Sequence, residues 1–249
     1  MTSWFLIAGA GILAGAMNAL AGGGSFVTLP TLIAAGVPSV AANASSTVAL
    51  YPGGAASAWV YRDGLTQVCG VPLRPTLWAT LAGGLLGALL LLWTPTSVFD
   101  RVLPWLLLAA SLMLAFGPRI GPALRARFRA GLVTVLLIQF VLGIYGGYFG
   151  GAVGLMMMAA WALLDGADVK ALNAPRTLLV SAANGVAVLC FIVAGVVRWP
   201  EALTMGVGAL LGGYVGAHAG RRLPPAVVRL VTVLVAGVTT LVFFVRAYG

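Results

Sequence analysis

The sequence predicts an all-α, polytopic membrane protein built from two inverted repeats of about five helical segments each. Of its 249 residues, 61% are hydrophobic and only 8% are charged, and the mean hydropathy is +1.06, far above that of soluble globular domains. Apolar runs recur along the whole chain, most of them long enough to cross a bilayer. The second half also repeats motifs of the first half in the same order.

The first half is expected to contain five helical segments, some of them short or broken. Three consecutive glycines, Gly22-Gly23-Gly24, follow the first apolar run and favour a break, because glycine stabilises a helix poorly. The next run contains Pro30 and is too short to span a bilayer by itself. A third segment has a weak point at Pro52-Gly53-Gly54, where we expect an interruption. The expected segments are residues 4–21, 25–36, 39–61, 75–93 and 102–116.

The second half repeats these features at an offset of about 128–130 residues, which predicts an internal duplication. Its apolar runs fall at residues 132–148, 183–197, 202–219 and 227–245. Glycines four residues apart in both halves, such as Gly83 and Gly87, are typical of close helix packing. The matched motifs are Gly22-Gly23 with Gly150-Gly151, residues 43–47 with 173–177, and residues 83–88 with 212–217.

The basic residues predict the topology. The segment 117–129 carries Arg119, Arg125, Arg127 and Arg129 and no acidic residue, so it is expected in the cytoplasm. It would link a membrane repeat over residues 1–116 to a second repeat over residues 130–249. An odd number of crossings in each half makes the two repeats inverted. We therefore expect a multi-pass protein of the bacterial inner (cytoplasmic) membrane.

One arginine of the second half stands beside several polar residues within a long apolar stretch. Arg176 belongs to the stretch 172–184, in which Asn173, Thr177, Ser181 and Asn184 recur every three or four residues and so share one helix face. An intramembrane charge is costly and usually faces a protein interior or a water-filled cavity. A guanidinium group offers paired donors that match carboxylate, sulfonate or sulfite oxygens.

Two other interpretations of these polar residues stay open. Arg176 lies near the start of its helix, so its side chain could extend to the membrane interface. Ser, Thr and Asn side chains also hold membrane helices together without touching a substrate.

The two glycine-rich breaks and the two polar clusters are expected to line one central site, because equivalent parts of inverted repeats meet near the midplane of the bilayer. Broken helices expose backbone N–H groups that attract anions. The predicted substrate-binding residues are Asn43, Ser45, Ser46, Thr47, Asn173, Arg176, Thr177 and Asn184. The predicted backbone and hinge residues are Gly22, Gly23, Gly24, Gly150 and Gly151.

The sequence argues against several classes of function. It contains no catalytic dyad or triad, no P-loop and no metal-ligand cluster, so we expect neither an enzyme nor a cofactor. The net charge of +9 comes from arginines clustered at segment ends, which mark topology rather than a nucleic-acid partner. The expected partners are a small anionic substrate and the lipid bilayer, and a homodimer stays open.

No carboxylate lies deep in a segment, where a coupled transporter usually carries its proton. The inside-negative potential already drives an anion outward, by about 2.3 kcal/mol per charge per 100 mV. We therefore expect export. Uptake would require a coupled ion, held by His218 or by a Na⁺ site made of carbonyls at a broken helix.

The chain resembles the sulfite exporter TauE/SafE family, also called the toluene sulfonate uptake permease family. The resemblance rests on these stretches: Gly22-Gly23-Gly24-Ser25 through Pro30 to residues 42–47, then 147–154, 172–179 with Asn184, Gly195 through Trp199, Gly212-Gly213 and Arg222-Leu223-Pro224. Family members often carry Lys followed by Asn where this chain has Arg176-Thr177. The resemblance implies a secondary transporter of small anions such as sulfite, thiosulfate, sulfoacetate and other organosulfonates, in either direction.

Two alternative functions remain. The first is a permease for a carboxylate or another small metabolite, with Arg176 extended to the interface. The second is a membrane scaffold without cargo. The near-symmetric breaks speak against the scaffold, since it has no need for weakened helices at equivalent positions.

Overall fold

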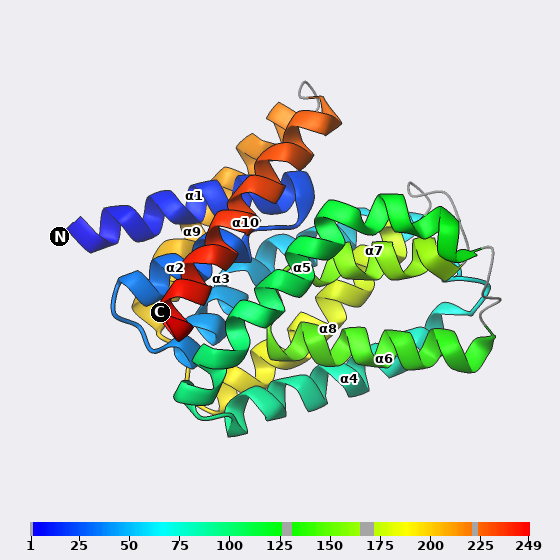
Figure 1. The fold of residues 1–249 in the computed structure, drawn as a ribbon, viewed down its shortest axis with the longest axis horizontal. Coiled ribbons are helices and arrows are strands. Elements are labelled where there is room, and N and C mark those ends of the chain that lie inside the picture. Colours follow the sequence, from blue (N-terminus) through cyan, green and yellow to red (C-terminus); the bar gives the residue numbers. More distant parts are fainter. Residues whose placement is uncertain (1, 126–130, 165–171, 221–223) are drawn as a thin grey trace.

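The computed structural model describes residues 2–125, 131–164, 172–220 and 224–249, and this part of the chain is all-α (Figure 1). The first half contains α1 (Thr2–Ala21), α2 (Ser25–Ala34), α3 (Ser39–Val60), a short 3-10 helix η1 (Arg62–Gly64), α4 (Leu73–Trp93) and α5 (Thr96–Arg125). The second half contains α6 (Leu132–Tyr148), α7 (Val153–Leu164), α8 (Asn173–Val193), α9 (Trp199–Gly220) and α10 (Pro225–Tyr248).

Several of these helices have the length and composition of membrane-spanning segments. Four of the described helices qualify by both measures: α4, α5 over Thr96–Met113, α8, and α10 over Leu230–Tyr248. The prediction of an all-α membrane protein is confirmed. Arg127, Arg129 and Arg222, which the sequence analysis used, lie outside the described residues.

Both predicted helix breaks are present. α1 ends at Ala21 and the chain turns at Gly22, whose φ is +77°. α6 ends at Tyr148 and the chain turns at Gly150, whose φ is +73°. Glycine adopts this left-handed conformation without the steric cost of a Cβ. Each break is followed by a short helix, α2 with 10 residues and α7 with 12 residues.

Several expected boundaries differ from the structure, including those of α3 and α5. α3 continues through Pro52-Gly53-Gly54 without an interruption. Proline removes one backbone hydrogen bond, but α3 packs against both α8 and α9, and these contacts stabilise it as one helix. α5 continues to Arg125 rather than ending at Phe116. The sequence becomes less apolar after Phe116, but the helix can continue because each of its hydrogen bonds joins residues only four positions apart.

Helices of the two halves interleave. α1 packs along α9, and α4 packs along α6 (Figure 1). The helices of the two halves correspond in chain order, so α1 matches α6 and α4 matches α9. The pair α1–α9 therefore corresponds to the pair α6–α4. The same correspondence relates α3–α9 to α4–α8, and α5–α7 to α2–α10. This pattern agrees with a two-fold relation between the halves, while the inversion of the repeats across the bilayer stays a prediction.

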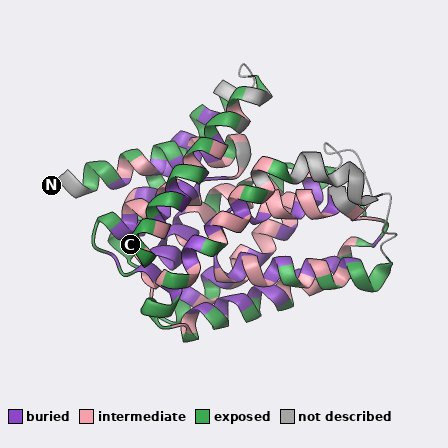
Figure 2. Ribbon diagram, in the orientation of Figure 1, coloured by how far each residue is buried: buried purple, intermediate pink, exposed green. Residues whose placement is uncertain are grey.

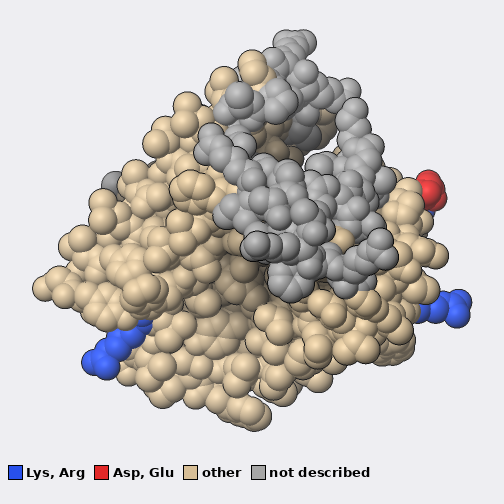
Figure 3. Space-filling model, turned by 45° about the vertical axis from the view of Figure 1, so that its right-hand side comes forward, with Lys and Arg blue, Asp and Glu red and all other residues tan. Residues whose placement is uncertain are grey.

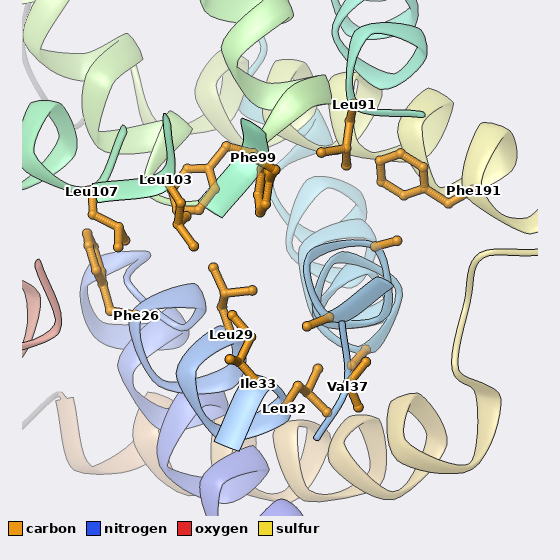
Figure 4. Packing of buried hydrophobic residues seen from close by; sticks show 14 of the residues in the cluster. Phe26, Leu29, Leu32, Ile33, Val37, Leu91, Phe99, Leu103, Leu107 and Phe191 are labelled. Carbon is orange, nitrogen blue, oxygen red and sulfur yellow. The ribbon is translucent and has the colours of Figure 1, made fainter. Parts of the chain in front are cut away.

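The largest hydrophobic core surrounds the short helix α2. Phe26 and Leu29 of α2 point toward Leu103 and Phe99 of α5, and all four are at most 1% exposed (Figure 4). Leu32 of α2 is also fully buried in this core. Burial of large side chains is the main source of stability for such a segment, which is too short to be stable alone. The core therefore fixes the position of α2, and with it the first break.

Much of the outer surface is apolar. Exposed residues line the outward faces of the helices (Figure 2), as with Leu234, Val238 and Leu241 of α10. On the face seen in Figure 3, the coloured charged side chains lie at the edges of the molecule. An apolar surface of this extent suits a lipid environment rather than water.

Candidate functional site

A cavity of about 100 Å³ lies where the two helix breaks meet α3 and α8. This space can hold several water molecules or one small anion. Both halves of the chain contribute to its wall, because α1, α2 and α3 belong to the first half, and α7 and α8 to the second. Six of the predicted site residues line it: Gly22, Thr47, Gly150, Arg176, Thr177 and Asn184.

Arg176 lies in the first turn of α8, and the stem of its side chain lies close to Gly154 of α7. A Cβ built on Gly154 would lie 3.6 Å from Arg176 Cδ, so the glycine leaves room for the arginine stem. The ion pairs among the described residues are Arg62–Asp63 and Arg198–Glu201. No hydrogen bond or ion pair within that part of the chain involves the Arg176 guanidinium. Among the described residues, no acidic side chain pairs with this charge.

The short helices direct their N-termini at the same cavity. Ser25, the first residue of α2, lines it, as do Val153 and Gly154 at the start of α7. The first N–H groups of a helix have no partner within the helix and carry a partial positive charge. Together with Arg176, these two helix ends make the cavity attractive to an anion.

The threonines of the site use their hydroxyl protons within their own helices. Thr47 Oγ1 donates to Asn43 O at 2.9 Å, and Thr177 Oγ1 donates to Ala174 O at 2.9 Å. A hydroxyl group has one proton, so each oxygen can act only as an acceptor toward the cavity. Donors to an anion are then Arg176 and the backbone N–H groups rather than these threonines.

Three predicted site residues of α3 make hydrogen bonds elsewhere instead of lining the cavity. Asn43 Nδ2 donates to Tyr148 O at 3.0 Å, just before the second break. Ser45 Oγ accepts from the backbone N–H of Arg198 at 2.8 Å, in the connection between α8 and α9. Ser46 shares a hydrogen bond with Thr28 of α2. These bonds join both breaks and the α8–α9 connection to the N-terminal half of α3.

The remaining predicted residues do not line the cavity either. Gly23 packs near Thr232, Gly24 lies against Ala14 and Asn18, and Gly151 lies against Phe149. Asn173 is the first residue of α8. The three glycines lie at the predicted breaks, and none of these four residues is among those that line the cavity.

The structure adds lining residues that were not among the predicted site residues, including Asn18, Ser25, Tyr51 and Ser57. Tyr51 could have been found from the internal repeat. Asn43 corresponds to Asn173, and the same offset takes Tyr51 to Ser181, which was noted on the polar face of α8 and also lines the cavity. Asn18 and Ser25 flank the first glycine break and carry no further signal in the sequence.

The chain is similar to known membrane proteins over most of its length. The family model described as "Sulfite exporter TauE/SafE" matches residues 7–243. The chain is 30% identical to "Probable membrane transporter protein YfcA" of Escherichia coli (strain K12), over 96% of this chain and 88% of that protein. It is 31% identical to a "Probable membrane transporter protein" of Haemophilus influenzae, over 83% of this chain and 81% of that protein. No solved structure matches the chain.

Proposed function

Because the chain belongs to the sulfite exporter TauE/SafE family of membrane transporters, we propose that it moves a small sulfur-containing anion across the bacterial inner membrane by alternating access. Sulfite, thiosulfate and organosulfonates are the proposed substrates. The relatives are named as probable membrane transporters, and the choice of a sulfur-containing anion is our proposal.

One observation carries the proposal: Arg176 lines a cavity between two helix breaks, and no hydrogen bond or ion pair with another described residue involves its guanidinium. A sulfite or sulfonate group presents several oxygens that can accept paired N–H donors. The N-termini of α2 and α7 add partial positive charge to the same cavity. We propose that Arg176 binds the anion, with the amide group of Asn184 and the first N–H groups of α7 as further donors.

Alternating access requires that one side of the site be closed while the other opens. The hydrogen bonds of Asn43, Ser45 and Ser46 all lie on the side of α3 nearer its N-terminus. The opposite end of the cavity reaches Ser57 and Arg176, near the loop that begins with η1. We propose that these hydrogen bonds close the outer side, and that the conformation in hand faces the cytoplasm.

Export is the direction that we propose for an anion that moves alone. The inside-negative potential favours outward movement by about 2.3 kcal/mol per charge per 100 mV, so export requires no coupled ion. Uptake of the same anion would have to overcome this energy.

Flux measurements with the purified protein test the proposal. Labelled sulfite, thiosulfate and sulfoacetate are offered to proteoliposomes at potentials set by K⁺ and valinomycin, with acetate as a carboxylate of similar charge. We expect saturable flux of at least one sulfur anion that follows the potential, and slower flux of acetate. Equal or faster acetate flux would favour the carboxylate permease, and the absence of flux for every anion would contradict the proposed function.

A further inference from the structure

Three oxygen atoms converge on a small space beside Gly150. A Cβ built there would lie 3.2 Å from Thr47 Oγ1, 3.5 Å from Asn184 Oδ1 and 3.5 Å from Gly146 O. These atoms come from α3, α8 and the last turn of α6, so both halves of the protein contribute. The space borders the central cavity, since Thr47, Gly150 and Asn184 all line it.

Each of these oxygens lacks a hydrogen-bond donor within the described chain. Asn184 Oδ1 is buried and has no partner there. Thr47 Oγ1 donates its proton to Asn43 O, so the lone pairs of the Thr47 oxygen can point toward another group. The N–H groups of Phe149 and Gly150 both donate to Tyr145 O, so neither satisfies Gly146 O. A buried acceptor without a donor is costly, and a ligand with positive charge would remove that cost.

We propose that this space binds an alkali cation of the size of Na⁺. The C-terminal end of α6 carries partial negative charge, and the carbonyls of broken helices coordinate such ions in membrane transporters generally. All three oxygens are neutral, and no group of three or more His, Cys, Asp or Glu residues gathers in the described part of the chain. This composition favours a monovalent cation over Ca²⁺ or Mg²⁺, which take carboxylate ligands.

The first helix break provides an internal comparison. Gly22 has nearly the same φ as Gly150, +77° against +73°. Yet nothing lies within 4 Å of a Cβ built on Gly22. The turn itself therefore does not require an oxygen cluster, and the cluster distinguishes the second break from the first.

The cation site would couple to the anion site. Asn184 follows Arg176 by eight residues, which is about 12 Å along α8. A cation beside Gly150 and the charge of Arg176 would thus lie at two ends of the same cavity and both attract the anion. This coupling rests on the proposed function. When a monovalent cation moves together with a monovalent anion, the pair carries no net charge, and the cation gradient drives transport. The potential-driven export proposed above applies to the anion moving alone.

The first test measures cation binding without any substrate. The thermal unfolding midpoint of the detergent-solubilised protein is compared in NaCl and in choline chloride at equal ionic strength, since choline is too large for the space. We expect Na⁺ to raise the midpoint of the wild type by about 3 °C, because a ligand that binds only the folded state stabilises it. Thr47→Val and Asn184→Leu should lose this rise. Asn184→Asp, which adds a charge at the same position, should require less Na⁺ for it.

The glycines supply a matched control. Gly150→Ala and Gly22→Ala both place a Cβ on a residue with positive φ, so they share the backbone strain. Only Gly150→Ala fills the space between the oxygens. We expect Na⁺ to raise the unfolding midpoint of Gly22→Ala above the value that this variant has in choline chloride. Gly150→Ala should show no such rise.

The second test uses flux. In proteoliposomes, replacing choline by Na⁺ should reduce the dependence of anion flux on the membrane potential in the wild type but not in Thr47→Val. Equal midpoints in the two salts would overturn the site, and so would a Na⁺ effect that Thr47→Val, Asn184→Leu and Gly150→Ala all retain. A Na⁺-dependent midpoint without any anion flux would instead support the site and contradict the proposed function.

Discussion

Replacing Arg176 with alanine is expected to lower the initial rate of anion flux by about 100-fold or more, without lowering the amount of folded protein in the membrane. The guanidinium can donate two charge-assisted hydrogen bonds to a sulfite or sulfonate group. At about 1.5 kcal/mol for each bond, their loss corresponds to roughly 100-fold in binding. Flux is measured in proteoliposomes that contain equal amounts of protein.

Two further variants separate charge from position. Arg176→Lys keeps the charge but offers no planar pair of donors, so we expect part of the flux to remain. Arg246→Ala removes an exposed arginine at the end of α10, away from the cavity, and should leave flux unchanged. If Arg176→Ala transports like the wild type, the interpretation in which this side chain merely reaches the membrane interface becomes the better one.

Replacing Gly87 with valine is expected to cause a large loss of stability. A Cβ on Gly87 would overlap Ile144 O and lie 2.7 Å from Tyr148 N, both on the backbone of α6. Backbone atoms cannot rotate away, so α4 and α6 would have to separate. Overpacking of this kind costs about 1–3 kcal/mol or more, which corresponds to a fall of about 5 °C or more in the thermal unfolding midpoint.

Gly9→Val is the matched control for this variant. Gly9 also lies within a helix, and nothing is within 4 Å of a Cβ built there. Its midpoint should stay near that of the wild type, apart from the modest effect of valine on helix propensity. If both variants lower the unfolding midpoint by similar amounts, the loss comes from replacing a helical glycine and not from the close approach of α4 to α6.

The sequence was sufficient to predict the all-α membrane fold, because hydrophobic runs and glycine-rich breaks depend on local composition. It predicted breaks at Gly22 and Gly150, and both are present. It failed at Pro52, where contacts of α3 with α8 and α9 maintain a helix that the local sequence weakens. Such contacts between distant parts of the chain leave no mark on local composition.

The site was predictable to a similar extent. The spacing of Arg176, Thr177 and Asn184 indicated one helix face, and that face lines the cavity. The polar cluster of α3 was harder to interpret, because residues 43–47 occupy all sides of a helix. Only the packing of α3 shows that Thr47 reaches the cavity while Ser45 bonds to the backbone of Arg198.

The central claim, that the anion binds between the breaks at Arg176, is tested most directly by protecting a thiol in the cavity. Ser181, which lines the cavity, is replaced by cysteine after Cys69 and Cys190 are replaced by serine. The rate of modification by a small charged maleimide is then measured with increasing sulfoacetate. We expect sulfoacetate to slow modification in a saturable way, and Arg176→Ala to abolish that protection. Modification that sulfoacetate leaves unchanged, in protein that still transports it, would contradict the claim.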